Sequence, residues 1–305
     1  MDRTMSLYAF RPLMEMNVVS SRRALPILMY HSISDDAESG TSPYYRTSTR
    51  PVLFAHHMRW LKDEGFRSVG LEEGLRLAQQ GGLEQNMAVV ITFDDGFRDF
   101  YDAAFPILKA CGHTATVFLP TAFIGQNRQS FKNKECLTWK EVRELRAQGI
   151  QFASHTVSHP VLYESSWAEI GNELSASKRK LEQELGEQVT SFAYPYAFPQ
   201  QDSYFVDAFK KLLQEQGYRS CVTTMIGRVR ANDDLLSLKR LPVNSGDDQP
   251  LLSAKLNGAY DGLGYLQSWS KAVRHQLRQF FQSGSGARSA RPSAAALPSS
   301  RSLQP

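Results

Sequence analysis

The stretch Met-Ala-Val-Val-Ile-Thr-Phe-Asp-Asp-Gly at residues 87–96 joins a β-branched apolar run to two adjacent carboxylates and a glycine. Such a run is typical of a buried strand whose polar end is delivered to a loop that can carry out chemistry. The same Asp-Asp-Gly can also be ordinary turn chemistry, because Asp bonds to its own backbone and Gly adopts a positive φ. The stretch therefore predicts a central strand and leaves two interpretations of Asp94 and Asp95 open.

Apolar strands alternate with amphipathic helices on both sides of this stretch. Besides 87–91, strands are predicted at 25–31, 67–71, 114–119, 150–154, 191–196, 220–224 and 238–243. Helices are predicted at 53–64, 72–80, 97–111, 137–148, 167–185 and 204–216. This alternation is typical of parallel β/α units and predicts an α/β barrel or a doubly wound sheet. We favour the barrel because polar residues end several different strands, as the active site of a barrel requires.

Length and composition narrow the class of protein. With 305 residues, of which 42% are hydrophobic, the chain can form one large α/β domain or two smaller ones. The net charge of +4 lies partly in C-terminal arginines and gives no nucleic-acid footprint. Cys111, Cys136 and Cys221 are widely spaced, which predicts neither a disulfide framework nor a zinc ribbon.

Four segments are predicted: an N-terminal extension at 1–23, an ordered domain at 24–248, a helical segment at 249–282 and a disordered tail at 283–305. Apolar residues at 269–281 recur at helical spacing, which favours a core-packing helix, with peripheral membrane contact as the alternative. No stretch reaches the roughly 18 apolar residues of a transmembrane span. No signal-peptide core is found in the first segment, so the expected location is the cytoplasm.

A second motif, Ser-His-Thr-Val-Ser-His-Pro at 154–160, follows another apolar strand. Its two histidines lie four positions apart and can point the same way, and neutral imidazoles are the usual nitrogen ligands of zinc and similar ions. Pro160 disfavours a helical conformation at His159, so the pair is expected in a turn at the strand exit. A histidine pair at this spacing also occurs by chance on solvated helices.

Together the two motifs predict a catalytic metal. Two histidines and one aspartate leave an open position for water, as in catalytic rather than structural sites. The doubled acid at 94–95 has a chemical use, since one carboxylate can bind the metal while its neighbour takes a proton from water. Non-haem iron oxygenases share this ligand set, but their acid usually lies close to the first histidine, and here it lies far upstream.

The order of three motifs, at 92–96, 154–160 and 192–196 (Phe-Ala-Tyr-Pro-Tyr), resembles the polysaccharide deacetylase (NodB-homology) family of metal-dependent carbohydrate esterases. The resemblance covers about residues 24–248. It implies a distorted (β/α) barrel that removes acetyl groups from N-acetylated sugars. It also implies a divalent metal, for which zinc is expected and cobalt or nickel are alternatives.

The resemblance assigns roles to residues of this chain. Asp94 becomes the general base, and the backbone amide of Tyr196, which follows Pro195, helps to bind the oxyanion. The implied metal ligands are Asp95, His155 and His159.

The chain departs from the commonest pattern of the family at two places. The third motif has Phe192 or Ala193 where an arginine is usual, and the late Leu-x-His motif that supplies the general acid is missing. Met-Tyr-His-Ser-Ile at 29–33 resembles the opening of a permuted branch, which includes biofilm poly-N-acetylglucosamine deacetylases and in which the acid-bearing strand comes first. His31 is therefore the predicted acid. Arg240 can replace the missing arginine beside the base, or it is a solvated strand residue.

The predicted function is removal of N-acetyl groups from amino sugars of a glycan or glycan precursor, as in exopolysaccharide biosynthesis. A deformylase or O-acetyl esterase of the same fold and a non-catalytic glycan-binding relative are the alternatives, and an iron oxygenase ranks last. The remaining helix-associated histidines, His56, His57 and His113, are expected to lie at the surface.

Overall fold

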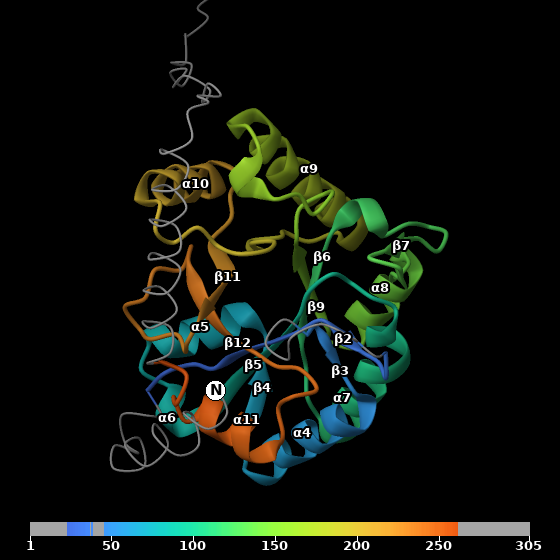
Figure 1. Cartoon of the computed structure of the whole chain (residues 1–305), viewed down its shortest axis with the longest axis vertical. Helices are drawn as coiled ribbons and strands as arrows, with labels where there is room; N and C mark the ends of the chain where they lie inside the picture. Colours follow the sequence, from blue (N-terminus) through green and yellow to red (C-terminus); the bar gives the residue numbers. More distant parts are fainter. Residues whose placement is uncertain (1–22, 37, 39–45, 262–305) are drawn as a thin grey trace, which may run out of the picture. The chain divides into compact units, whose positions relative to one another are not determined.

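The computed structural model describes residues 23–36, 38 and 46–261, shown in colour in Figure 1. The predicted extension, except for its last residue, the helix at 269–281 and the tail at 283–305 lie outside the described residues. Within the described residues, no helix has the length and apolar character that crossing a membrane requires.

Seven parallel strands form a closed ring in the described part of the chain (Figure 1). Their order around the ring is β1 (Ile27–Tyr30), β12 (Leu238–Pro242), β11 (Ser220–Ile226), β10 (Ser191–Ala193), β9 (Gln151–Ser154), β6 (Thr116–Leu119) and β5 (Ala88–Phe93). Pairing of β1 with β5 closes the ring, and β4 (Arg67–Val69) pairs along β5. The predicted (β/α) barrel is confirmed, with the N-terminal strand between the last strand and the central one.

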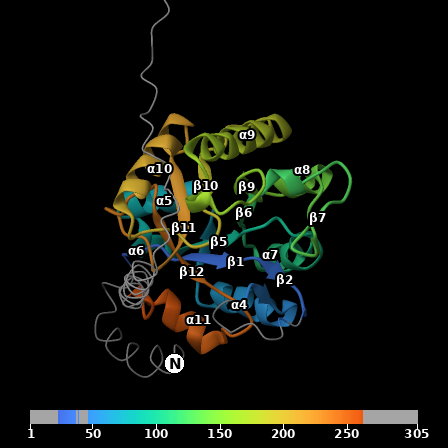
Figure 2. The same cartoon turned by 45° about the horizontal axis from the view of Figure 1, so that its top comes forward.

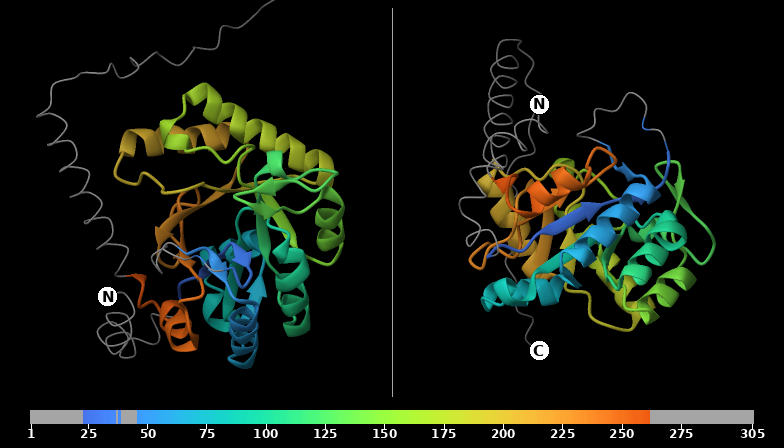
Figure 3. Two further views of the ribbon diagram at one scale, coloured as in Figure 1. Left: turned by 45° about the vertical axis from the view of Figure 1, so that its right-hand side comes forward. Right: turned by 90° about the horizontal axis from the view of Figure 1, so that it is seen from below.

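Helices surround the ring, as Figures 2 and 3 show from three further directions. They are α4 (Pro51–Asp63), α5 (Leu71–Gln79), α6 (Leu83–Asn86), α7 (Phe105–Cys111), α8 (Trp139–Ala147), α9 (Trp167–Leu185), α10 (Ser203–Glu215) and α11 (Gln249–Leu256). Capping boxes start α8 and α9, where Thr138 pairs with Glu141 and Ser166 with Glu169.

The predicted helix at 97–111 is divided in the structure. A π-helical turn, η3 (Phe100–Ala104), precedes α7. Pro106 in the first turn of α7 has no N–H to donate to the preceding turn, so the regular helical hydrogen-bond ladder is interrupted there.

Strand residues alternate between two apolar layers. Ile27, Val90 and Phe118 belong to one buried cluster, and their neighbours Leu28 and Ile91 belong to the other. This period of two is expected when one face of each strand points into a barrel and the other meets the helices. Leu251, Leu252 and Leu256 of α11 also join the second cluster.

The expectation that His57 and His113 lie at the surface is wrong. His57 is buried on α4, with Nε2 2.7 Å from the Asp247 carbonyl oxygen and Nδ1 3.1 Å from the Tyr30 hydroxyl. His113 is also buried, 3.0 Å from the carbonyl oxygen of Met58. Each imidazole makes hydrogen bonds to groups on elements that are distant in sequence. A helical pattern in the local sequence cannot predict such contacts.

The loop after β6 contains an unpredicted hairpin. Strands β7 (Ser130–Phe131) and β8 (Lys134–Glu135) pair antiparallel around Lys132 and Asn133, which both have positive φ. A smaller parallel pair, β2 (Ser32–Ile33) with β3 (Ser48–Thr49), follows β1. Because all ring strands are parallel, their C-terminal ends meet at one mouth, where the site is found.

Candidate metal centre

Asp95, His155 and His159 form the only buried group of acidic, histidine and cysteine side chains with metal-ligand spacing that the described residues contain. Asp95 follows β5, and both histidines follow β9. The Nε2 atoms of His159 and His155 lie 3.3 Å and 3.7 Å from Asp95 Oδ1. One ligand atom of each residue lies within 4.8 Å of the others, a spacing that a single ion can bridge.

The backbone around this group is locally strained. Asp95, Thr156, His159 and Tyr196 all have φ between 56° and 72°, in the left-handed region. With Lys132 and Asn133 of the hairpin, they make up six of the seven non-glycine residues of this kind in the described chain. Such conformations cost about 1–3 kcal/mol each and gather at functional sites, where the surrounding structure holds them.

Hydrogen bonds fix the histidine turn. His159 N–H donates to Thr156 Oγ1 at 2.9 Å, and the N–H groups of Val157 and Ser158 donate to the Glu173 carboxylate on α9 at 2.7 Å and 2.9 Å. These bonds give partners to the backbone N–H groups of the turn. The turn does not continue as a helix, because Pro160 disfavours a helical conformation at His159.

The charge state of His155 suits a metal ligand. Burial, opposed mainly by the negative charge of Asp94, lowers the pKa of His155 to about 4, so its ring is neutral at physiological pH. Its Nδ1 lies 2.8 Å from the Ala193 carbonyl oxygen and donates to it. The Nε2 lone pair therefore faces Asp95, which is how a backbone carbonyl orients a metal-binding imidazole.

One carboxylate oxygen of Asp95, Oδ1, faces the two histidines. Its Oδ1 is buried and has no hydrogen-bond partner within the described residues. Burial would raise the pKa of Asp95, but the adjacent His159 imidazole and the nearby charges hold it well below its usual range. An ionised oxygen without a partner, next to two imidazole nitrogens, is the donor set of a divalent cation, so these residues fit a metal.

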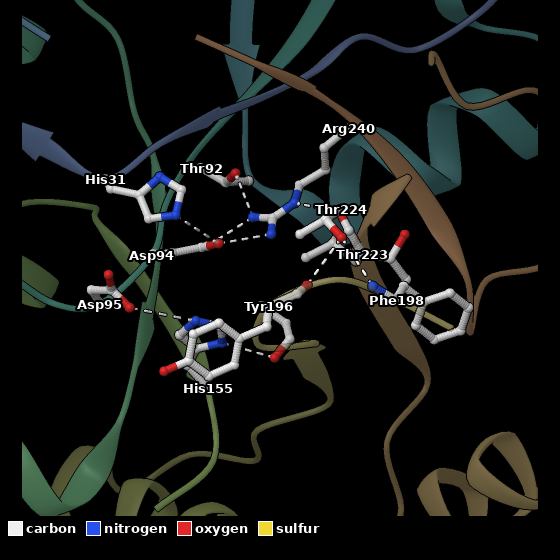
Figure 4. Close-up of polar contacts among 12 residues, drawn as sticks. His31, Thr92, Asp94, Asp95, His155, Tyr196, Phe198, Thr223, Thr224 and Arg240 are labelled. Carbon is white, nitrogen blue, oxygen red and sulfur yellow. Dashed lines mark hydrogen bonds and ion pairs between the residues drawn. The ribbon is translucent and has the colours of Figure 1, made fainter. Parts of the chain in front are cut away.

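Asp94 faces a different partner, as Figure 4 shows. Arg240 Nη1 and Nη2 each donate to one Asp94 oxygen at 2.7 Å, and Arg240 Nε donates to the Thr223 carbonyl oxygen at 3.0 Å. Burial would raise the pKa of Asp94, but Arg240 and the neighbouring histidines lower it to about 2. The sequence leaves open whether Arg240 is a solvated strand residue or lies beside Asp94, and the structure shows a side chain that is fully buried against Asp94.

His31 lies on the other side of Asp94. It follows β1, which pairs with β5, and its Nε2 lies 3.9 Å from Asp94 Oδ2. Burial lowers the pKa of His31, although the charges of Asp94 and Asp95 oppose that effect. The ring closure thus brings His31 beside the two carboxylates despite a separation of more than 60 residues in sequence.

Tyr196 follows buried Pro195 in the loop after β10 and covers His159, with ring centroids 4.5 Å apart at 75°. Its carbonyl oxygen accepts a hydrogen bond from Thr224 Oγ1 at 3.0 Å, and Thr224 in turn accepts from the Phe198 N–H (Figure 4). The N–H of Tyr196 donates to no group among the described residues. It is available to a bound molecule.

Lys132, at the tip of the hairpin, is a site residue for which the sequence offered no signal. Its Nζ lies 3.0 Å from Asp95 Oδ2, the oxygen that does not face the histidines. The same ammonium lies 4.7 Å from the Phe131 ring centroid and 5.5 Å from that of Tyr196.

Comparison with known sequences identifies relatives with the same organisation. The family profile described as polysaccharide deacetylase matches residues 83–220. YxkH of Bacillus subtilis, assigned by name to the polysaccharide deacetylases, is 32% identical over 236 residues, which are 77% of this chain and 75% of YxkH. The poly-β-1,6-N-acetyl-D-glucosamine N-deacetylase of Staphylococcus aureus is 28% identical over 57% of this chain and 65% of that enzyme.

Solved structures share the barrel. The deacetylase PplD of Streptococcus pyogenes, solved in complex with acetate, has a TM-score of 0.67 and 29% identity over 76% of this chain and 98% of PplD. IcaB of Ammonifex degensii has a TM-score of 0.63 over 77% of this chain and 97% of IcaB. At 20% identity, the second likeness concerns the fold alone.

Proposed function

The chain belongs to the polysaccharide deacetylase family, and we propose that its barrel mouth hydrolyses N-acetyl groups on amino sugars of a glycan or glycan precursor. The observation that carries the proposal is the division of two adjacent carboxylates. Asp95 faces His155 and His159, whereas Asp94 faces Arg240 and His31. This division supports a role for Asp95 in holding a cation and for Asp94 in proton transfer.

Asp95, His155 and His159 would hold the metal. A divalent ion bound there supplies a Lewis acid that polarises the acetyl carbonyl and makes water a better nucleophile. We propose zinc, with cobalt or nickel as alternatives, because two imidazoles and one carboxylate are usual ligands of catalytic zinc.

Asp94 is proposed as the general base. Its low pKa keeps it ionised at physiological pH, and the two hydrogen bonds from Arg240 hold the carboxylate in one orientation. A carboxylate held this way can accept a proton from water as the water adds to the carbonyl carbon. Its two hydrogen bonds to Arg240, rather than contacts with His155 and His159, support this role over that of a metal ligand.

Two further groups complete the proposed reaction. The Tyr196 N–H, which donates to no group among the described residues, is proposed to donate to the developing oxyanion, a contribution commonly worth about 3–4 kcal/mol. His31 is proposed to protonate the sugar nitrogen as the C–N bond breaks, since an amine leaves poorly as an anion. The products are acetate and a free amine, and no covalent enzyme intermediate is required.

Measuring product release from a substrate panel tests this function. Metal-stripped protein is reloaded with zinc, cobalt or nickel and given N-acetyl, N-formyl and O-acetyl sugars, as monomers and oligomers. Acetate release from N-acetylated amino sugars is the expected result. Faster release of formate or of ester acetate would move the assignment to the deformylase or esterase. Glycan binding without release of any acyl group would indicate a non-catalytic relative, and oxygen consumption would indicate an oxygenase.

A further inference from the structure

His31, the proposed acid, lies between two residues that are both hydrogen-bonded to the loop after β5. On one side, the carbonyl oxygen of Tyr30 accepts the N–H of Asp94 at 3.0 Å. On the other side, the Ser32 hydroxyl donates to Asp99 Oδ2 at 2.5 Å. The first bond is a backbone bond that continues the pairing of β1 with β5. The second bond depends on two side chains that take no part in the proposed reaction.

The Asp99 side chain is directed at Ser32 and not at its own helical turn. Asp99 directly precedes η3, a position where an aspartate usually accepts an N–H from the first turn, yet its side chain makes no such bond. Burial raises the pKa of Asp99, and the hydrogen bond from Ser32 is the largest effect that opposes this rise. Ser32 itself is fully buried. The carboxylate therefore depends on a partner from the segment that follows β1.

Lys134, on strand β8 of the hairpin, bonds to the same serine. Its Nζ donates to Ser32 Oγ at 2.9 Å and forms an ion pair with Asp36. The carbonyl oxygen of the next residue, Glu135, accepts the N–H of Arg98 at 2.8 Å. The hairpin is thus bonded both to the segment after β1 and to the loop after β5. Three chain segments that are distant in sequence are joined pairwise around Ser32.

The placement of His31 gives this polar cluster a use. Buried charged and polar groups are commonly no more stable than apolar packing of the same volume, so stability alone is a weak explanation for them. Here the cluster borders the residue whose Nε2 lies 3.9 Å from Asp94 Oδ2, as Figure 4 shows. A misplacement of about 1 Å between reacting groups can cost about 10²-fold in rate. A fixed backbone on both sides of His31 limits such misplacement.

We propose that Ser32, Asp99 and Lys134, which we call the serine clamp, are positioning residues that hold His31 beside the two carboxylates. They do not touch the substrate and act through the backbone of the residue next to Ser32. This inference rests on the proposed function, in which His31 protonates the departing amine. It adds the residues that keep an acid from the first strand of the barrel in register with a base that lies far away in sequence.

A comparison of two leaving groups tests the serine clamp in the full, metal-loaded chain. An amine leaves only with a proton, whereas the nitrophenolate of para-nitrophenyl acetate leaves as an anion. For Ser32→Ala we expect kcat for an N-acetylated amino sugar to fall about 10- to 100-fold, and kcat for para-nitrophenyl acetate to change less than about twofold. His31→Ala should shift the ratio of the two rates further in the same direction. The metal content of Ser32→Ala should equal that of the wild type.

Further variants separate positioning from a general loss of structure. Asp99→Asn keeps an oxygen that can accept the Ser32 hydroxyl and should stay within about threefold of the wild type, whereas Asp99→Ala should behave like Ser32→Ala. Lys134→Met should shift the ratio less, because Asp99 keeps its hydroxyl partner. Ser220→Ala is the matched control. It removes a buried hydroxyl that donates to Ser191 Oγ at 2.9 Å at the start of β11, the barrel end opposite the mouth, and should leave the ratio unchanged.

Hydrogen exchange followed by mass spectrometry tests the clamp without turnover. The backbone N–H groups of residues 30–34 should exchange about five- to tenfold faster in Ser32→Ala than in the wild type, and at the wild-type rate in Ser220→Ala. An unchanged ratio of the two rates, equal losses for both substrates, or unchanged exchange at 30–34 would overturn the clamp. If the wild type releases acetate from no N-acetylated sugar, the proposed function fails separately. The exchange of residues 30–34 then still decides whether the clamp holds this segment.

Discussion

Asp94 and Asp95 are each paired with a positively charged side chain, and these two side chains differ in burial and in the number of hydrogen bonds they make. Arg240 rises from a barrel strand, is fully buried, and makes two hydrogen bonds to Asp94. Lys132 comes from a hairpin tip, its side chain is 41% exposed, and it makes one hydrogen bond to Asp95. The second oxygen of Asp95 has no partner within the described residues. We call Asp94 with Arg240 the closed half of the site, because both carboxylate oxygens are paired. We call Asp95 with Lys132 the open half, because one oxygen remains for another cation.

This difference explains how adjacent residues can have separate roles. A buried bidentate ion pair leaves a carboxylate little freedom and keeps it ionised. A half-exposed lysine contributes little to stability and can move into water when another positive charge arrives. The proposed base therefore stands in the rigid half, and the proposed metal ligand stands in the half that can exchange its partner.

The largest expected effect is that of removing a ligand from the open half. His155→Ala should lose bound metal and lower acetate release more than about 10³-fold, because both the Lewis acid and its alignment are lost. Metal content and acetate release of the purified variant measure this. His56→Ala, which changes an exposed histidine on α4, should leave both unchanged. Full metal content in His155→Ala would contradict the ligand assignment.

Removing the cation of the closed half should mainly affect stability. Arg240→Met leaves Asp94 buried without its partner, so the free energy of unfolding should fall by about 3–5 kcal/mol. Denaturant unfolding measures this, with Arg179→Met, an exposed position on α9, as control. A loss below about 1 kcal/mol would place Arg240 in the class of surface ion pairs.

The pH dependence of that loss follows from the pKa of Asp94, which is lowered from 3.8 to about 2 in the folded protein. A depressed acid pKa stabilises the folded state above the unfolded value, and this contribution disappears as the pH falls through the folded value. The unfolded states bind protons alike, so the difference between wild type and Arg240→Met should be largest near neutral pH and shrink as the pH falls toward 2. A difference that grows in acid would contradict the ion pair.

The smallest effect is expected for Lys132→Ala. In the metal-loaded protein, the free energy of unfolding should change by less than about 1 kcal/mol. The metal-free variant should lose more, because Asp95 then has no cation. By the thermodynamic cycle, the variant should bind metal more tightly, by up to about tenfold. Competition with a chelator measures this affinity, and Lys140→Ala, at an exposed position, is the control. Weaker metal binding by Lys132→Ala would show that the lysine supports the ligand instead of competing for it.

The part of the site that sequence could predict is the part written in contiguous motifs. Asp95, His155 and His159 follow apolar strands, and parallel strands bring such ends to one mouth. The α9 bounds of 167–185 also match, because a capping box and a C-terminal glycine mark both ends. By contrast, Lys132 meets Asp95 across 37 residues from a hairpin without periodic pattern. Arg240 meets Asp94 across 146 residues, and no local pattern distinguishes a buried arginine on a strand from a solvated one.

The most direct test of the divided carboxylates compares Asp94→Asn with Asp95→Asn, since asparagine preserves the shape of each side chain and removes its charge. Metal content and acetate release are measured on both variants. Asp94→Asn should retain the metal content of the wild type while kcat falls about 10²- to 10⁴-fold, because only the base is lost. Asp95→Asn should lose the metal. Loss of metal from Asp94→Asn, or near wild-type turnover in that variant, would contradict the account.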